Sequence, residues 1–147
     1  MSSTNSTGQY GGLLTTWNPK KGFFSPYRTM AKTLIMGDFT GFCTKLHIRN
    51  CYGTYGDIYQ FWDQIQKDNF LKLPFLILGG DINFTVGIVE VWVEKSCLDP
   101  MGDFFIHSFE KEGMVDITQG PMRPMWINQR DGIEATGKHL GHFLIAK

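Results

Sequence analysis

One stretch of the chain decides its fold, LILGGDIN at residues 76–83. Its continuous apolar run is typical of a strand buried on both faces of a sheet. Two glycines then permit a tight turn, and Asp81 and Asn83 follow where that strand ends. A carboxylate and an amide so placed can bind a hard cation or orient water and a phosphate oxygen. The alternative is an ordinary turn closed by Asx hydrogen bonds.

Strands and helices alternate outward from this stretch. Alternation and β-favouring composition predict further strands at residues 13–17, 32–36, 42–52, 126–128 and 143–145. Apolar residues at helical spacing predict a helix over residues 57–70 and a second one from Asp99-Pro100 to Gly113. This order predicts a mixed α/β (α+β) fold, with helices packed on a sheet.

The 147 residues suffice for one domain. With 42% apolar and 14% aromatic residues, the composition excludes an intrinsically disordered chain. The first ten residues are polar and predict a disordered tail, which leaves residues 11–147 as the domain. Lys and Arg total 14, as do Asp and Glu, so the chain lacks the overall positive field typical of nucleic-acid-binding domains.

Several functional classes lack their sequence signals. The three cysteines form no CxxC pair, which favours a reducing compartment over a disulfide framework or a zinc site. No signal peptide and no apolar run long enough to span a bilayer is present, so we expect a nuclear or cytoplasmic protein that is neither secreted nor membrane-bound. Neither GxGxxG nor a P-loop occurs, and we expect no small-molecule cofactor.

Two other groups of residues have metal-ligand character. His139 and His142 lie three positions apart, but no neighbour in the sequence completes a ligand set, and we expect two partly exposed histidines. Glu90, Glu94 and Asp99 could add carboxylates to a metal cluster. An ordinary acidic loop is the simpler interpretation of these three residues, and we expect no metal ligands in either group.

Five motifs occur in a characteristic order. They are NCYG at 50–53, FW at 61–62, LILGGDIN at 76–83, WINQR at 126–130 and LGHFL at 140–144. Together they resemble the endonuclease/exonuclease/phosphatase superfamily, the DNase I-like fold. The resemblance is closer still to the endonuclease domain of LINE-type non-LTR retrotransposons, and it extends from about Gly11 to the C-terminus.

The resemblance implies a partial four-layer α/β sandwich with a site at the strand ends. It also implies hydrolysis of phosphodiester bonds in DNA with Mg²⁺ or Mn²⁺. Carried over, Tyr52 matches a tyrosine that hydrogen-bonds phosphate, and Asp81 matches the aspartate that orients or deprotonates the attacking water. Asn83 matches an asparagine that contacts the phosphate. Trp126 and Asn128 match a strand beside the site and are expected to line the DNA groove.

The chain also departs from the family pattern. The family's Leu-Asp-Arg-Phe-Leu motif has Gly141 in place of its aspartate and His142 in place of its arginine. The strands with the family's first asparagine and its metal-binding glutamate are expected before Gly11, and its Ser-Asp-His motif beyond Lys147. Because catalytic residues act as a set, loss of members is strongly non-additive.

These departures leave three hypotheses open. The chain is either a relic with little or no Mg²⁺-dependent nuclease activity or a working nuclease completed by further sequence or a second chain. The third hypothesis is a catalytically inactive module that binds nucleic acid or protein. Zero net charge gives little counterion-release energy on DNA, which places DNA binding by such a module last.

Overall fold

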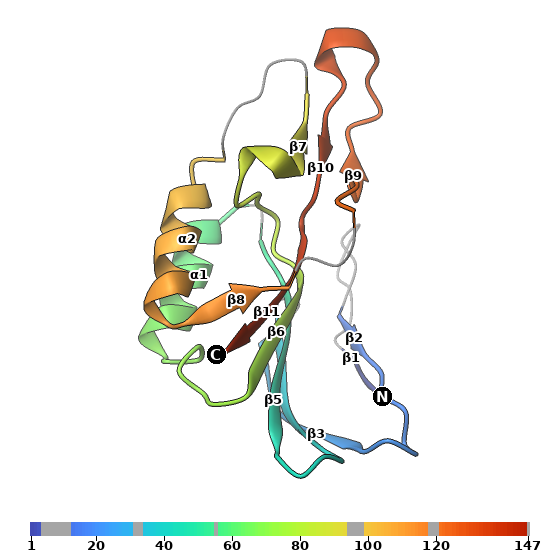
Figure 1. Cartoon of the computed structure of the whole chain (residues 1–147), viewed down its shortest axis with the longest axis vertical. Coiled ribbons are helices and arrows are strands. Elements are labelled where there is room, and N and C mark those ends of the chain that lie inside the picture. Colours follow the sequence, from blue (N-terminus) through green and yellow to red (C-terminus); the bar gives the residue numbers. More distant parts are fainter. Residues whose placement is uncertain (4–12, 31–33, 55, 94–98, 118–120, 147) are drawn as a thin grey trace.

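A six-stranded sheet forms the centre of the molecule (Figure 1). The computed structural model describes residues 1–3, 13–30, 34–54, 56–93, 99–117 and 121–146. Across the sheet, the strands are β3 (Phe23–Met30), β4 (Leu34–Thr40), β5 (Leu46–Tyr52), β6 (Leu76–Asp81), β11 (Gly141–Ala146) and β8 (Met114–Asp116). Only the β5–β6 pair is parallel in this sheet; its other neighbouring strands are antiparallel.

Two helices cover one face of this sheet, α1 (Ile58–Lys67) and α2 (Gly102–Lys111) (Figure 1). A parallel pair needs a crossover connection, and α1 supplies it between β5 and β6. The main core fills the space between helices and sheet, and its largest buried side chain is Trp62 of α1. The predicted mixed α/β fold is confirmed, including both helices and the strand formed by the 76–83 stretch.

The opposite face of the sheet carries a smaller core and a short ribbon. β1 (Ser2–Ser3) pairs with β2 (Leu14–Thr15), and Leu13 packs there with Phe24 and Ile35. The side chain of Asn50 on β5 donates to the Leu14 carbonyl at 3.1 Å, which ties the ribbon to the sheet. Ser2 and Ser3 thus form a strand within the predicted tail, whose remaining residues, from position 4 onward, lie outside the described ranges.

A small three-stranded sheet projects beyond one end of the large one (Figure 1). Its central strand is β10 (Gly137–Lys138), flanked by β7 (Val91–Trp92) and β9 (Trp126–Ile127). Two short 3₁₀ helices adjoin these strands, η1 (Ile88–Glu90) before β7 and η2 (Gly132–Glu134) between β9 and β10. The predicted strand at 126–128 therefore belongs to this small sheet.

The strand predictions differ from the structure in several places, and the strand predicted over 42–52 begins only at Leu46. The strand predicted at 32–36 continues as β4 beyond Met36, through Gly37 and Asp38 to Thr40. Gly37 is needed for packing, since a Cβ there would lie 2.3 Å from the Phe24 ring. β3 was not predicted, because it is an edge strand with Pro26 at a register shift and mostly exposed side chains, and so shows no apolar alternation.

The second helix also begins later than predicted. Its first residue is Gly102 and its N-cap is Met101, while Asp99 accepts a hydrogen bond from the Met101 N–H at 3.0 Å in the preceding turn. None of the helices in the described ranges is long and apolar enough to cross a membrane.

Candidate functional site

The candidate site begins at the end of β6, where Asp81 and Asn83 form a tight Asx turn. The backbone N–H of Asn83 donates to Asp81 Oδ1 at 3.0 Å, and Asn83 has a left-handed φ of 58°. The Asn83 Nδ2 group donates to the carbonyl of Gly53, in the loop that follows β5. Its Oδ1 is buried and has no hydrogen-bond partner among the residues that the structure describes. The Asx turn is therefore present, and it holds the Asp81 carboxylate and the Asn83 amide together, as the site interpretation also requires.

The backbone at Gly80 sets the close approach of β5 to Asp81. Gly80 has a φ of 138°, and a Cβ there would lie 1.9 Å from the Cys51 carbonyl oxygen. Just beyond it, the Gly53 N–H donates to the Asp81 carbonyl at 2.7 Å. A glycine is needed because any side chain would push the two strands apart.

Three positions singled out in the sequence lie in one row across three adjacent strands. Tyr52 of β5 pairs in register with Asp81 of β6, and Asp81 pairs with Gly141 of β11. Registered neighbours in a sheet share a face, so these three residues lie on the same face of the large sheet, the one opposite the helices. Tyr52 packs at the margin of the smaller core, while Asp81 and Gly141 border a cavity.

This cavity of about 530 Å³ lies between the end of the large sheet and the small sheet. Its wall includes Asp81, Gly141, Trp126 and the sulfur side chain of Met125. Asn128 is not among the residues that line it. The Asn128 Oδ1 accepts hydrogen bonds from the backbone N–H groups of Arg130 and Thr136, and its Nδ2 donates to the Glu134 carbonyl, so this side chain ties together its own β9–β10 hairpin.

The Asp81 carboxyl lies in an unusual electrostatic environment. Burial raises its pKa above the ordinary value of 3.8, although the Asn83 N–H and the charge of His142 oppose that rise. A carboxylate with a raised pKa is a stronger base, and such groups occur often at functional sites. A raised pKa also means that ionisation of the Asp81 carboxyl destabilises the folded chain relative to the unfolded chain.

We expect an Asp81→Asn variant to be more stable than the wild type at pH 7. The amide keeps the acceptor for the Asn83 N–H but removes the buried charge. Below pH 3.8 the carboxyl is protonated in both folded and unfolded chains, so the difference should vanish; it should grow as pH rises through the raised folded pKa. Urea unfolding across this pH range measures it. The exposed Asp131→Asn should show no such trend, and an equal response in both variants would contradict the prediction.

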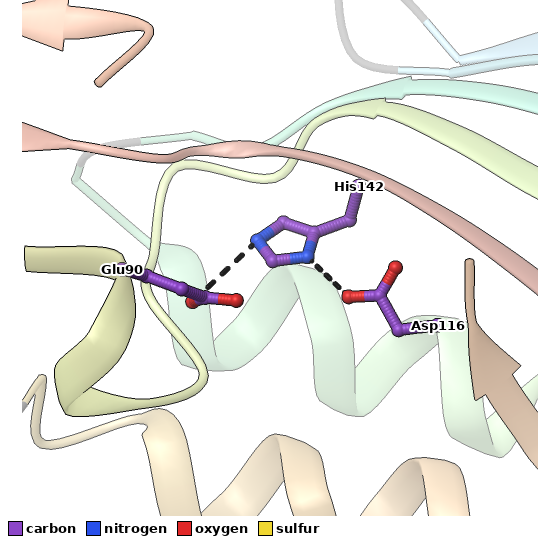
Figure 2. Close-up of side chains that lie close together, drawn as sticks. All are labelled: Glu90, Asp116 and His142. Atoms are coloured by element: carbon purple, nitrogen blue, oxygen red, sulfur yellow. Dashed lines mark hydrogen bonds and ion pairs between the residues drawn. The ribbon is translucent and has the colours of Figure 1, made fainter. Parts of the chain in front are cut away.

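A second polar group lies at the same end of the sheet and was not predicted. His142 is only 2% exposed, so the expectation of two partly exposed histidines was wrong for His142, although His139 is half-buried. The His142 ring lies between two carboxylates, those of Asp116 and Glu90 (Figure 2). Glu90 is buried as well, which corrects the interpretation of this residue as part of an acidic loop.

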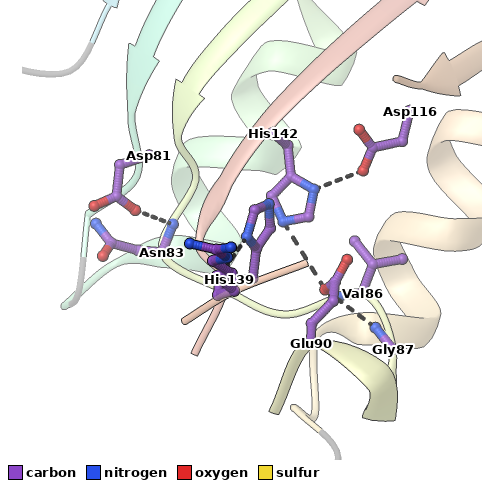
Figure 3. A network of polar contacts seen from close by, with 9 residues as sticks. Asp81, Asn83, Val86, Gly87, Glu90, Asp116, His139 and His142 are labelled. Atoms are coloured by element: carbon purple, nitrogen blue, oxygen red, sulfur yellow. Dashed lines mark hydrogen bonds and ion pairs between the residues drawn. The ribbon is translucent and has the colours of Figure 1, made fainter. Parts of the chain in front are cut away.

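Figure 3 shows how this group lies relative to Asp81. Glu90 and Asp116 line the cavity that Asp81 borders, and the rings of His139 and His142 lie edge to face with centroids 5.5 Å apart. Alternation along β11 explains the arrangement, because Gly141 and His142 are successive residues and face opposite sides of the sheet. Spacing in the sequence does not reveal it: Asp116 is 26 positions from His142. Glu94, the other candidate carboxylate, lies outside the described residues.

The fold is similar to that of a solved endonuclease domain. The endonuclease domain of TRAS1, a telomere-specific non-LTR retrotransposon, superimposes with a TM-score of 0.63 at 15% sequence identity. The match covers 84% of this chain and 56% of that domain, so this chain spans about half its length. No protein-family model and no curated protein matches the chain. The likeness thus shows that this chain shares the fold of that endonuclease domain.

Proposed function

We propose that the chain is a phosphodiesterase domain of the retrotransposon-endonuclease type, with DNA as its substrate and with little hydrolytic activity of its own. The observation that carries the proposal is the row of Tyr52, Asp81 and Gly141 across three adjacent strands, two of them bordering the cavity. The row presents a phenol and a carboxylate, followed by a glycine where the resembling family has a second carboxylate. A DNA substrate would place the chain in the nucleus or cytoplasm.

The residues at the end of β6 divide the chemistry between them. Asp81, with its raised pKa, accepts a proton from the attacking water and orients it. Asn83 holds the turn through its backbone N–H and Nδ2 groups, which keeps the Asp81 carboxylate in place. Tyr52 supplies a phenol as a hydrogen-bond donor for a phosphate oxygen.

The donor set is a partial fit to Mg²⁺ or Mn²⁺. When bound, such an ion would offset charge on the phosphate and polarise the scissile bond. Mg²⁺ is usually held by one or two carboxylates together with substrate phosphates and water. Asp81 supplies one carboxylate, and the described residues place no group of three acidic, histidine or cysteine ligands around it. The fit is therefore partial because the protein supplies a single carboxylate, and this accounts for the low activity we propose.

A Gly141→Asp variant should gain Mg²⁺-dependent nicking of supercoiled plasmid over the wild type. The added Cβ would lie 2.8 Å from the end of the exposed Met125 side chain, which can move aside. The new carboxylate would then stand beside Asp81 in register. Changes even to groups behind a metal's direct ligands commonly alter activity 10- to 100-fold, so we expect a gain of about tenfold or more.

The control is the same substitution combined with Asp81→Asn, which should abolish the gain. Equal nicking by wild type and Gly141→Asp would contradict the assignment of position 141. Strong nicking by the wild type that Asp81→Ala removes would instead overturn the proposal of low activity.

A second candidate function is a binding module without catalysis. It is favoured by exposed apolar side chains on and around the β9–β10 hairpin, where Met125, Ile127 and Ile133 are 66%, 57% and 75% exposed. Such a concentration of exposed apolar residues is typical of surfaces that bind a partner. Retention of DNA on a filter that weakens as the salt concentration rises would identify nucleic acid as that partner. Absence of DNA retention at every salt concentration would favour a protein partner.

A further inference from the structure

Glu90, Asp116 and His142 form a group that has no role in the proposed phosphodiesterase chemistry. One ligand atom from each residue lies within 4.8 Å of the other two. The side chains of His142 and Glu90 are 1% and 6% exposed, and that of Asp116 is 32% exposed. They come from β11, from η1 and from β8, so the group joins three separate segments (Figure 2).

The proton on His142 can be placed from its contacts. Nδ1 lies 2.6 Å from Asp116 Oδ2. An ionised carboxylate can only accept, so Nδ1 carries a hydrogen and donates it. This leaves Nε2 as the atom directed at Glu90, and it is buried without a hydrogen-bond partner in the described structure. Metal-bound histidines usually donate the hydrogen of their other ring nitrogen to a carboxylate in this way.

Glu90, across the gap from His142 Nε2, is also held in place by hydrogen bonds. Glu90 Oε2 accepts the backbone N–H of Val86 at 2.5 Å and that of Gly87 at 3.3 Å. The same oxygen lies 3.9 Å from His142 Nε2, too far for a hydrogen bond. Two bonds of about 2.1 Å each, as Zn²⁺ makes to imidazole nitrogen and carboxylate oxygen, span at most ~4.2 Å and about 3.4 Å at the tetrahedral angle. The gap falls within that range.

We propose that this group is a binding site for a divalent transition-metal ion of the Zn²⁺ type. Glu90 Oε2 and His142 Nε2 are its ligands, Asp116 is the positioning residue that holds the imidazole, and water from the cavity completes the coordination. The cavity lined by Glu90 and Asp116 gives the ion and its water a way in. An imidazole ligand selects Zn²⁺ over the hard cation Mg²⁺. The site stands apart from the proposed phosphodiesterase function and does not depend on it.

Calorimetric titration of the full chain with Zn²⁺ tests the proposal. We expect one Zn²⁺ to bind per chain, and Mg²⁺ not to compete. His142→Asn keeps a donor for Asp116 but has no Nε2, and Glu90→Gln keeps an acceptor for the Val86 N–H but lacks the charge. Each should weaken Zn²⁺ binding by at least about tenfold.

Two matched controls should leave the Zn²⁺ affinity unchanged. His47→Asn removes an imidazole that also contacts an aspartate, Asp38, at 2.8 Å, but that belongs to no group of three possible ligands in the described ranges. Cys43→Ser removes an exposed thiol, the strongest competing zinc ligand on the described surface. Co²⁺ bound in place of Zn²⁺ should show no thiolate charge-transfer absorption.

The urea midpoint of unfolding distinguishes a variant that has lost a zinc-binding side chain from one that no longer folds. Because Zn²⁺ would join β11 and η1 directly, it should raise the urea midpoint of the wild type and not that of either ligand variant. Absence of Zn²⁺ binding, or binding that both ligand variants leave unchanged, would overturn the proposal and identify the group as a buried ion pair of a protonated imidazole. Asp81→Asn should keep the Zn²⁺ affinity, so failure here is distinct from failure of the phosphodiesterase proposal.

Discussion

A Trp62→Ala variant is expected to lose about 3–5 kcal/mol of the free energy of unfolding, the usual cost of truncating a buried tryptophan. Trp62 of α1 is 1% exposed. Its ring contacts those of Phe105 and Phe109 on α2 and of Phe84, with centroid distances of 4.9, 6.3 and 5.9 Å. The substitution would leave a cavity where both helices meet the loop after β6. Urea unfolding followed by circular dichroism measures the change.

The effect should reach the candidate site through Phe84, which directly follows Asn83 in the chain. Trp126→Ala is the matched control, since it removes the same atoms from a side chain that is 41% exposed, and its effect should stay within about 0.5 kcal/mol. A similar loss in both variants would show that the helix-facing core does not centre on Trp62. Amide exchange in the Asn83 turn should rise in Trp62→Ala and stay unchanged in the control.

A Gly80→Ala variant should lose about 4 kcal/mol, through two effects that act together. An alanine at a φ of 138° is strained, which typically costs ~1–3 kcal/mol. Its Cβ would also lie 1.9 Å from the Cys51 carbonyl oxygen, and relieving such a contact by moving strands costs a further ~1–3 kcal/mol. Since β5 and β6 are joined at this point, the variant should also displace Asp81. Thermal or urea unfolding gives the magnitude.

Gly113→Ala separates these two effects. Gly113 also has a positive φ, 66°, but no atom lies within 4 Å of where its Cβ would be. It should therefore show the strain alone, about 1 kcal/mol. If Gly80→Ala proves no more destabilising than Gly113→Ala, then β5 and β6 can separate at little cost, and the argument for glycine at position 80 would be wrong.

Much of the fold could be predicted because its signals are local. The apolar run before Gly79 identified β6, and the spacing of Ile58, Trp62 and Ile65 identified α1. Asp81 and Asn83 could be paired because two residues and one hydrogen bond make the turn. By contrast, the edge strand β3 has no alternation to detect, since most of its side chains are exposed and its pairing shifts register at Pro26.

The candidate site likewise combines features that local sequence predicts with features that depend on strand pairing. The resemblance singled out Tyr52, Asp81 and Gly141, but their alignment in one row depends on the register of β5, β6 and β11. Asn128 could not be separated from Trp126 by sequence, because hydrogen bonds within the hairpin, rather than residue type, turn its side chain away from the cavity. The roles of these residues in hydrolysis stay predictions until nicking is measured.

The sequence by itself determined the α/β class, the buried strand at 76–83 and the Asp81–Asn83 turn, because each depends on residues a few positions apart. Only the tertiary structure decided that His142 is buried between Glu90 and Asp116. Strand pairing brings β8 beside β11, and the loop after β6 carries Glu90 back to the same place. No local periodicity encodes such a meeting, since it depends on which strands become neighbours and on which face each residue then occupies.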